Sequence, residues 1–589
     1  MSESIIPMTT DVLVVGSGGA GLRAAIAAAE AGQSVLVMAK GKADRSGASL
    51  LAGANVSADV MCDGRSLYEM GLDYGDKDDS QDKWYRDIIH EGFYLNDRDL
   101  VRRYVELAPK VVRELVESGM KLADESEGGR QIGVPGASIL DYLYKRAKAA
   151  GVTFCENTML LDLLKSADGV VCGGLFLRLY DGELVRVGAK AVVLATGGMH
   201  GCYSFNSGTS GLCGAGQASA IRAGAAMTQM EMVTFCPDVI CAPAKYRGSI
   251  IPYIIQCFGF GRLLNGKGER FLHKYMSDRA VDLALHTEWN KLLLCYAMDR
   301  ELNAGLGNAD GGVTFSLNDL TDSEWDRLYT LLPELKKGMY KEIMALNEQN
   351  RGISVYAAGH YFDGGILVND KMAATLPGLF AGGECAGGLF GANRVGAATT
   401  QMLVQGLQAG ESAAVFAAGN SLAEPDYALL ERVTQQAVRP FTVQNGEDPR
   451  GLRKAVVDTI TRSAGVVREY RQMMIGLDNL EWLNNIDVSA EGGRAYNRPW
   501  IDWLEARDMI QCGKAILSSS FRRDESRGVF IRSDCMFTDD RTLTATIYQN
   551  GRAIMAPVEQ GDVAPDPVKR DYFENLEEVI TRLSYGGEV

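Results

Sequence analysis

The first forty residues carry the pattern that most constrains the fold of this chain. Asp11–Val15 is a short apolar strand, and a glycine-rich run, Gly16–Gly21, follows it directly. Leu22–Glu30 has the alanine-rich composition of a helix, Gly32 ends that helix, and Ser34–Met38 is a second apolar strand. A strand, a glycine turn, a helix and a second strand in this order predict a dinucleotide-binding βαβ unit.

The glycines stand where such a unit needs them. Gly16 permits the tight turn, Gly18 lets the backbone approach a pyrophosphate, and Gly21 allows the helix to pack closely on the strand. The phosphates then lie over the N-terminus of the helix. The end of the second strand, Val37–Lys40, lacks the acidic residue that binds the ribose of NAD. The unit therefore argues against a plain NAD site.

The length of the chain and two later glycine turns predict several domains. A chain of 589 residues exceeds the roughly 250 to 300 residues at which one core stops growing. Ala191–Gly198 and Leu376–Glu384 are apolar strands ending in glycine turns, which can place backbone N–H groups or a carboxylate beside a cofactor. Their separation predicts an inserted segment from about Val239 to Ala357.

The remaining patterns are mainly helical. Helix formers dominate Trp289–Leu302 and Ser323–Asn350 in the inserted segment, and Ala428–Val438, Gly451–Asn484 and Ile501–Arg522 after it. The last segment, Leu543–Val589, predicts one strand pair or an extended stretch, followed by a closing acidic helix. The predicted domains are a nucleotide domain in two segments (1–238 and 358–425), the inserted segment (239–357), a helical domain (426–542) and a C-terminal segment (543–589).

Charge and cysteine spacing exclude several classes of function. A formal net charge of -15 disfavours a protein that neutralises nucleic-acid phosphates or anionic lipid. The first ten residues lack a secretory signal, and no stretch approaches about 18 apolar residues, so we expect a cytoplasmic protein that meets a membrane only through a partner. The 12 cysteines form no CxxC pair, which argues against a zinc or iron–sulfur site.

Six motifs along the chain together resemble one family. They are the glycine run Gly16–Gly21, Ala225–Met232 (AAMTQMEM), Gly268–Phe271 (GERF), Gly359–Ile366 (GHYFDGGI), Gly391–Gly396 (GANRVG) and Glu525–Gly528 (ESRG). In this order they resemble the flavoprotein subunits of fumarate reductase and succinate dehydrogenase, a family that includes L-aspartate oxidase and the adenylylsulfate reductase alpha subunit. The resemblance covers nearly the whole chain.

The resemblance implies an α/β fold: a Rossmann-like FAD-binding domain in two segments, an inserted α+β capping domain, and a helical domain after it. Glu384 matches the carboxylate that binds the FAD ribose, and Thr399 and Thr400 open a helix that would face the flavin pyrimidine. A positive helix end there stabilises charge on reduced flavin. The implied FAD-binding residues are Gly16, Gly18, Gly19, Ala20, Gly21, Lys40, Ser46, Gly47, Ala48, Gly53, Ala195, Thr196, Gly197, Gly383, Glu384, Arg394, Thr399 and Thr400.

The resemblance also implies hydride transfer between flavin N5 and a carbon next to a carboxylate or carbonyl. His360 and Arg394 match residues that hold and polarise that group, since negative charge gathers there in the transition state. A lone histidine would more often be structural, and an arginine can brace a turn, but the motifs around both favour the catalytic role. Arg279, with Tyr361 behind it, is the reserve proton donor.

Three departures from the family pattern change the expected site. Arg45–Gly53 contains no histidine for covalent attachment, so FAD is expected to be noncovalent. Cys236 stands where the dicarboxylate enzymes have a substrate-binding histidine, and a thiol offers no cation at neutral pH. His286 falls near the position of the family's proton-donating arginine, where it is either the general acid or a surface histidine.

These features predict an FAD enzyme that reduces an activated C=C bond of a small anionic substrate, or dehydrogenates the saturated product. Two alternatives remain: C–N or S–O chemistry, as in aspartate oxidase or adenylylsulfate reductase, and a flavin electron-transfer subunit without its own substrate. Because the chain has no second dinucleotide unit and no iron–sulfur spacing, the expected electron partner is a separate iron–sulfur or flavin subunit.

Overall fold

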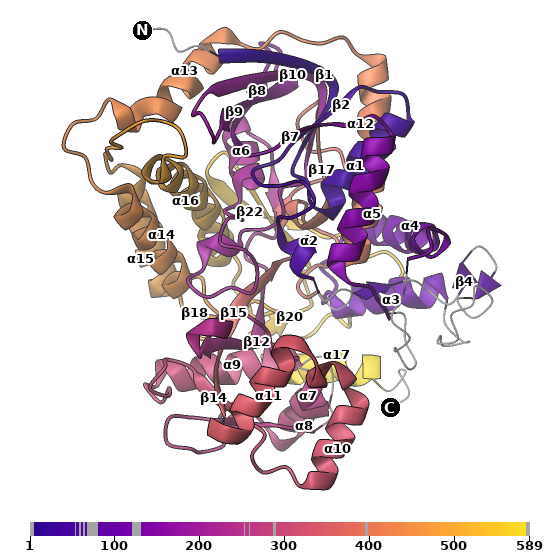
Figure 1. The fold of residues 1–589 in the computed structure, drawn as a ribbon. Coiled ribbons are helices and arrows are strands. Elements are labelled where there is room, and N and C mark those ends of the chain that lie inside the picture. Colours follow the sequence, from indigo (N-terminus) through magenta and orange to yellow (C-terminus); the bar gives the residue numbers. More distant parts are fainter. Residues whose placement is uncertain are drawn as a thin grey trace.

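A large upper body and a smaller lower lobe make up the molecule in the computed structural model (Figure 1). The structure describes residues 5–52, 55–57, 61–62, 65–66, 80–120, 131–252, 254–257, 259–286, 290–350, 352–394 and 398–584. Central to the upper body is a sheet with the strand order β7-β2-β1-β10-β9-β8, to which β17 adds by pairing with β10. Its strands are β1 (Ile5–Val15), β2 (Val35–Met38), β7 (Thr153–Cys155), β8 (Thr158–Lys165), β9 (Val171–Arg178), β10 (Leu184–Leu194) and β17 (Leu379–Ala381).

The strands β7, β2, β1, β10 and β17 pair in parallel, and β9 and β8 extend the sheet in antiparallel fashion from the first half of β10. Parallel strands buried on both faces favour continuous apolar runs, as in Val12–Val15. The last segment of the sheet, β17, comes from a part of the chain far beyond the first. The sheet is therefore assembled from separate stretches of sequence, as the glycine turns predict.

Helices cover both faces of this sheet. Helices α1 (Gly19–Glu30), α5 (Gly136–Ala149) and α12 (Ala398–Gly419) lie on one side in Figure 1, and α6 (Ala215–Ala223) and α16 (Arg498–Arg522) on the other. Helices α1 and α12 pack closely because α12 presents glycines: a Cβ at Gly406 would lie 2.5 Å from the carbonyl oxygen of Ala20. Helices α3 (Gln81–Glu91) and α4 (Arg98–Glu117) flank this side.

The lower lobe is built on a second sheet, with the order β12-β15-β14-β13. Its strands are β12 (Val233–Ala242), β13 (Arg262–Leu264), β14 (Val313–Ser316) and β15 (Ile353–Phe362). Its helices are α7 (Ile254–Cys257), α8 (Asp278–His286), α9 (Asn290–Asn303), α10 (Asp322–Leu331) and α11 (Gly338–Asn350). The long strands β12 and β15 run from the upper body into the lobe, so they cross the predicted boundaries at Val239 and Ala357.

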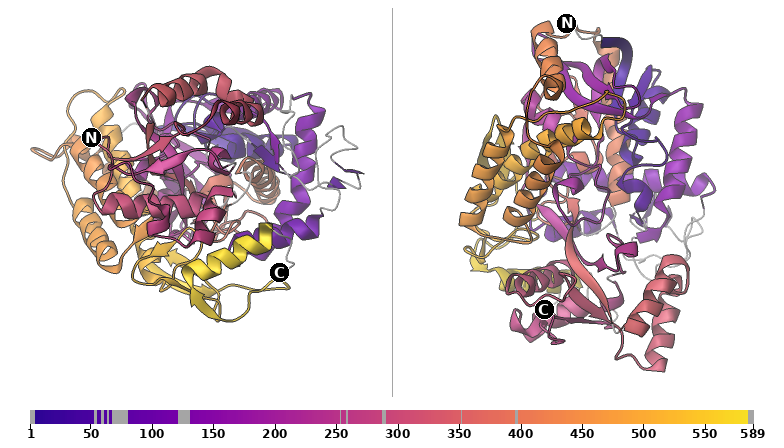
Figure 2. Two further views of the ribbon diagram at one scale, coloured as in Figure 1. Left: turned by 90° about the horizontal axis from the view of Figure 1, so that it is seen from below. Right: turned by 60° about the vertical axis from the view of Figure 1, so that its left-hand side comes forward.

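The helical region follows α12 and packs beside the upper body (Figure 2). It contains α13 (Tyr427–Val438), α14 (Pro449–Ser463), α15 (Tyr470–Asn484) and α16. The sequence pattern of Gly451–Asn484 indicates continuous helix, but the chain breaks between α14 and α15, where β18 (Val467–Arg468) pairs with β19 (Ile531–Arg532). Tertiary pairing overrides local helix propensity at this point.

The C-terminal segment forms the predicted strand pair and closing helix. Strands β21 (Thr544–Gln549) and β22 (Arg552–Pro557) are antiparallel and join β11 (Met227–Thr228) and β16 (Gly365–Ile366) in one sheet. Helix α17 (Tyr572–Ser584) lies against α8 of the lower lobe, where Ser277 donates a 2.8 Å hydrogen bond to Glu577. The short remaining elements are α2 (Ala48–Leu51), β3 (Asn55–Ser57), β4 (Met61–Cys62), β5 (Arg65–Ser66), β6 (Gln131–Gly133), β20 (Phe537–Asp539) and β23 (Lys569–Asp571).

None of the helices in the described part of the chain combines the length and apolarity that a bilayer crossing requires. Within the same residues, no three His, Cys, Asp or Glu side chains are placed to hold a metal ion.

Candidate active site

The predicted cofactor loops meet at one edge of the central sheet. The carboxyl ends of four strands lie in register, because Val15 pairs with both Met38 and Leu194, and Leu194 pairs with Ala381. The loops that follow these ends contain the predicted FAD-binding glycines and Glu384. In doubly wound folds this edge, where the connections diverge, is where nucleotides bind.

The first of these loops has no room for a side chain at Gly16 or at Gly21. Gly16 has a φ of +108°, and a Cβ there would lie 2.2 Å from the carbonyl oxygen of Ala195. A Cβ at Gly21 would lie 2.0 Å from the carbonyl oxygen of Gly16. Gly18 precedes α1 and provides no side-chain cap, which leaves the helix N-terminus to accept an anionic group. The loop therefore fits the close approach of a pyrophosphate.

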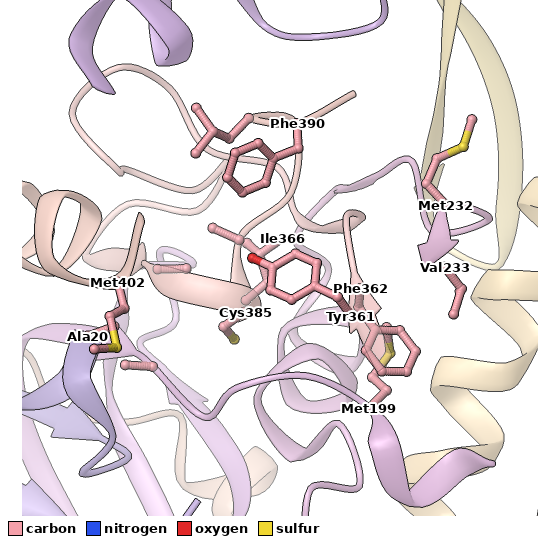
Figure 3. Close-up of a cluster of buried hydrophobic side chains, with 14 of the residues drawn as sticks. Ala20, Met199, Met232, Val233, Tyr361, Phe362, Ile366, Cys385, Phe390 and Met402 are labelled. Carbon is pink, nitrogen blue, oxygen red and sulfur yellow. The ribbon is translucent and has the colours of Figure 1, made fainter. Parts of the chain in front are cut away.

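Side chains from two distant segments surround the first turn of α1. The backbone N–H of Gly19 donates to the hydroxyl of Ser49 at 3.2 Å, and the hydroxyl of Ser49 lies 3.5 Å from the sulfur of Met402 on α12. Met402 lies beside Ala20 in Figure 3. The predicted residues Ser46, Gly47 and Ala48 lead into α2 just before Ser49, and Gly47 has a φ of +87°. These predicted FAD contacts thus lie together, whereas Gly53 lies outside the described residues.

The second and third loops contact each other. The hydroxyl of Thr196 lies 3.4 Å from the sulfur of Cys385, and Gly197 has a φ of +75°. Gly383 also has a positive φ, and its backbone N–H donates to Gln405. The Ala195–Gly197 turn and the Gly383–Cys385 turn therefore form neighbouring walls of the same crevice.

Glu384 is largely buried at the junction of these loops with β15. Its Oε1 accepts a 3.2 Å hydrogen bond from the backbone N–H of Phe362 and lies 3.7 Å from Nε2 of His200. Burial raises the pKa of the Glu384 carboxyl, while the charges of His200 and Arg394 act in the opposite direction. The predicted ribose carboxylate thus also links the nucleotide loops to the strand that carries His360.

One further predicted cofactor contact, Lys40, is engaged elsewhere, and two others lie in the first turn of α12. The Lys40 side chain pairs with Glu505 of α16 at 2.8 Å and donates to the carbonyl oxygen of Gly211, so it turns away from the glycine loop. Thr399 and Thr400 are buried in the first turn of α12, and the hydroxyl of Thr400 hydrogen-bonds to Tyr104. Lys40 therefore contributes a contact between domains, while the two threonines lie at the predicted helix terminus.

Arg394 contacts one predicted catalytic residue, Tyr361, and its charge acts on another, His360. Its guanidinium carbon stands 4.4 Å from the centre of the Tyr361 ring, over its face, in a cation–π arrangement. The Tyr361 hydroxyl donates to Oε1 of Gln401, and the ring lies within the apolar cluster of Figure 3 with Phe362 and Phe390. The pKa of Tyr361 is well above its ordinary value, mainly because of burial. Tyr361 therefore supports Arg394, and its phenol stays protonated.

A bulge in β15 turns His360 out of the regular strand. Thr234 pairs with Tyr361 and Phe235 with Gly359, so His360 is the extra residue between them. Its Nδ1 lies 2.7 Å from the hydroxyl oxygen of Ser207, and its carbonyl oxygen lies 2.8 Å from Nε2 of His200.

Burial is the main reason why the pKa of His360 lies well below its ordinary value, and the charges of Arg394 and Lys291 lower it further. At neutral pH the imidazole is therefore uncharged and stands beside a fixed cation.

A neutral thiol on β12 and a cation from the lower lobe also belong to the surroundings of His360. Cys236 on β12 is fully buried, and this burial raises the pKa of its thiol to about 12, although the charges of Lys291 and Arg394 oppose the shift. Lys291 is the second residue of α9 and acts electrostatically on both Cys236 and His360. The site thus has one cation from each body, Arg394 and Lys291.

Two of the predicted proton donors, Arg279 and His286, are not seen beside His360 and Arg394 within the described residues. Arg279 on α8 donates to the hydroxyl of Thr581 at 2.6 Å, and its side chain is 61% exposed. It faces α17, because the C-terminal helix packs against α8, so the structure removes it from the reserve donors. His286 ends α8, and its side chain lies outside the described residues.

Lys291 and Ser207 are site residues that sequence reasoning missed. The sequence offers one indication for Lys291, because it is a single cation immediately before the apolar run Leu292–Cys295. Ser207 had none, because its contact with His360 depends on the fold bringing together residues 153 positions apart.

Comparison with known proteins supports the family suggested by the motifs. Residues 11–400 match the FAD binding domain family, and residues 453–572 match the fumarate reductase flavoprotein C-terminal family. The chain is 29% identical to one subunit of the CoM/CoB fumarate reductase of Methanothermobacter marburgensis over 89% of this chain and 94% of that protein. It is 28% identical to the L-aspartate oxidase of Streptomyces coelicolor over 91% of this chain and 90% of that protein.

A solved structure has the same overall fold. Sdh1 of Mycobacterium smegmatis, in complex with UQ1, superposes with a TM-score of 0.81 at 26% sequence identity and covers 96% of both chains. The first family match alone spans more than half of this chain. The protein therefore belongs to the FAD-binding fumarate reductase and succinate dehydrogenase flavoprotein family and is an FAD-dependent oxidoreductase of that type.

Proposed function

We propose that this protein reduces an activated C=C bond next to a carboxylate, using electrons delivered by a partner protein. The observation that carries the proposal is that the charges of Arg394 and of Lys291, one from each body, both act on the buried, neutral imidazole of His360. A fixed cation and a neutral donor suit a carboxylate that gathers negative charge during the reaction, and a second cation suits proton transfer.

Arg394 and His360 hold the substrate carboxylate in this proposal. The Arg394 guanidinium pairs with the carboxylate oxygens, and its position over the Tyr361 ring fixes its plane. The Ser207 hydroxyl donates to Nδ1 of His360, which leaves the imidazole proton on Nε2, and Nε2 donates to the same carboxylate. Because His360 is uncharged at neutral pH, the positive charge of the site, among the residues that the structure describes, comes from Arg394 and Lys291.

Lys291 is the proposed proton donor, in place of His286 or Arg279. When bound and reduced by electrons from the partner, FAD would supply the hydride. The β carbon of the substrate receives this hydride, and Nζ of Lys291 donates a proton to the α carbon, so that the C=C bond becomes a saturated C–C bond. The lysine then regains its proton from solvent. Lys291 begins a helix of the lower lobe, so closure of the lobe onto the substrate would complete the site.

The FAD contacts proposed for this chain are the glycines and threonines of the crevice, with Glu384 at the ribose. We further propose that FAD is noncovalent, since Arg45–Gly53 offers no histidine. The electron donor is proposed to be an iron–sulfur or flavin subunit. One family relative is itself a subunit of a CoM/CoB fumarate reductase, which is consistent with a multi-subunit assembly.

A C–N oxidation is the second candidate, because the L-aspartate oxidase relative covers as much of the chain as the fumarate reductase relative does. Steady-state assays separate the two. With reduced viologen as electron donor, the proposal expects turnover of unsaturated carboxylates, and Lys291→Met should lower kcat about 100-fold with little change in KM. Flavin reduction by amino acids, with no turnover of any unsaturated carboxylate, would instead establish the C–N reaction.

A further inference from the structure

Asp238 lies at an irregular point of β12, two residues after Cys236. Cys236 pairs with Ala358 and Val239 pairs with Tyr356, so Pro237 and Asp238 together face a single residue of β15. Asp238 has a φ of +61°, in the left-handed region that a non-glycine residue rarely adopts. Bulges of this kind often redirect a side chain beside an active site.

The Asp238 carboxyl is fully buried and has no hydrogen-bond partner for either oxygen within the described residues. Burial raises its pKa to about 8, so at neutral pH it is mostly a neutral acid with a proton to donate. A buried polar group without a partner is costly, and such groups in folded proteins usually meet a ligand or water. The carboxyl is therefore a candidate for contact with a bound molecule.

Electrostatic contacts place Asp238 next to the candidate active site. The charge of Asp238 raises the pKa of the thiols of Cys236 and of Cys295 on α9. The charge of Lys291 lowers the pKa of the same two thiols. Lys291 and Cys295 are one helical turn apart and therefore lie on the same side of α9. Arg394 also acts on Cys236, but the Asp238 pKa shift has burial as its only cause. We therefore place Asp238 beside Cys236 and Cys295 and outside the reach of the Arg394 charge.

We propose that Asp238 determines substrate specificity by donating a hydrogen bond to a neutral acceptor at the end of the substrate remote from Arg394. The inference rests on the proposed function and names its substrate class: an unsaturated monocarboxylate whose other end carries a neutral carbonyl or a similar acceptor. A second carboxylate at that end would meet the Asp238 carboxyl, and Cys236 would offer it no cation, which disfavours a dicarboxylate.

Three probes with the same trans double bond and carboxylate test this inference. Fumarate ends in a second carboxylate, its monoamide fumaramate ends in a neutral amide, and crotonate ends in a methyl group. With the holoenzyme and reduced viologen, kcat/KM for fumaramate should exceed that for each of the other two by about tenfold, or 1.4 kcal/mol. In Asp238→Leu the ratio of fumaramate to crotonate should fall about tenfold, whereas Asp238→Asn, which still donates, should keep most of it.

Asp299→Leu is the matched control. Asp299 is also a carboxyl whose pKa burial raises, to about 7, but it bonds to Asn303 and lines a small pocket with Tyr203 and Phe235. Replacing Asp299 should leave the ratio of kcat/KM for fumaramate to that for crotonate unchanged. If Asp238→Leu fails to fold, the dissociation constants of fumaramate and crotonate for the oxidised wild-type holoenzyme, read from the flavin spectrum, give the same comparison.

Equal kcat/KM values for fumaramate and crotonate in the wild type would overturn the inference. An unchanged ratio of these two kcat/KM values in a folded Asp238→Leu variant would also overturn it. Turnover of crotonate would then still support the proposed function. If none of the probes reoxidises reduced wild-type flavin, the proposed function fails and the specificity role of Asp238 fails with it.

Discussion

At the scale of single residues, the candidate site is defined by which groups carry charge and which stay neutral. Arg394 and Lys291 are cations, while burial keeps the imidazole of His360 and the thiol of Cys236 uncharged. The site therefore offers a carboxylate one strong anchor at Arg394. It offers no cation at Cys236, where the resembling dicarboxylate enzymes have a histidine.

Cys236→His should restore part of that missing contact. Because a histidine can carry charge near neutral pH, the variant should raise the ratio of kcat/KM for fumarate to that for crotonate by about tenfold. Steady-state assays with reduced viologen measure this ratio. Cys236→Ala, which removes the thiol and adds no cation, serves as the control. An equal ratio in wild type, Cys236→His and Cys236→Ala would show that this position does not face the substrate.

The buried carboxyl of Asp238 predicts a specific pH dependence of stability. Its folded pKa of about 8 lies above the ordinary value of 3.8, so its contribution is complete at acid pH and is lost as pH rises toward 8. Each pH unit in that window costs up to about 1.4 kcal/mol for this one proton. Asp238→Asn has no proton to lose, so it avoids this loss of stability. The difference in Tm between the variant and the wild type should therefore rise between pH 5 and pH 8.

The exposed Asp326 gives the matched control, because Asp326→Asn changes a carboxylate that remains in water. Its Tm difference from wild type should be the same at both pH values. A Tm difference for Asp238→Asn that is equally flat would mean that the Asp238 carboxyl is not buried in its neutral form.

Much of the site was predictable from sequence, and the limits of prediction have a physical cause. His360, Arg394 and Glu384 stand in motifs whose local pattern is informative, and the fold brings them together. Arg279 was misplaced because nothing in its own segment indicates that α17 packs against α8. Lys291 acts on His360 only through the position of α9 in the lower lobe, which no local pattern encodes.

At the scale of elements, the strand–glycine–helix unit was predictable because its turn, helix and strand are each determined locally. The break between α14 and α15 was not, since it depends on pairing of Val467–Arg468 with a strand more than sixty residues later. The Glu525–Gly528 motif also has a role that sequence alone did not specify. Arg527 pairs with Glu525 and Asp540 in the core, and Val529 bonds to the backbone of Ala392, two residues before Arg394.

The glycine turn after β1 should be essential for holding FAD. In Gly16→Ala the new Cβ would lie 2.2 Å from the carbonyl oxygen of Ala195, at a φ of +108°. The backbone strain alone costs about 1–3 kcal/mol, and the loop must shift away from the pyrophosphate position. The purified variant should therefore contain little flavin, measured as the ratio of flavin to protein.

Gly419→Ala is the control, since a Cβ there meets no atom within 4 Å. This variant should carry as much flavin as wild type. Full flavin content in Gly16→Ala would contradict the assignment of this loop to the pyrophosphate.

At the scale of the whole molecule, the FAD-binding body and the lower lobe are joined by the long strands β12 and β15. Both strands carry candidate site residues, Cys236 on one and His360 on the other. The proposed reaction therefore takes place where the two bodies meet, with Arg394 from one and Lys291 from the other. This arrangement explains why residues from distant parts of the sequence are needed for one site.

Whether FAD is attached covalently can be tested on the complete holoenzyme. Because Arg45–Gly53 contains no histidine, acid precipitation should release all flavin into the supernatant and leave a colourless pellet. Flavin absorbance in the two fractions measures this directly. A yellow pellet after washing would show a covalent bond to another residue.

Single-turnover reoxidation shows whether this flavin passes its hydride to an unsaturated carboxylate held by Arg394. Anaerobically reduced holoenzyme is mixed rapidly with crotonate or fumaramate, and the return of oxidised-flavin absorbance is followed. We expect a rate that saturates with substrate in the wild type and falls about 100-fold or more in Arg394→Met. Flavin that stays reduced with every unsaturated carboxylate, or that reoxidises equally fast in Arg394→Met, would contradict it.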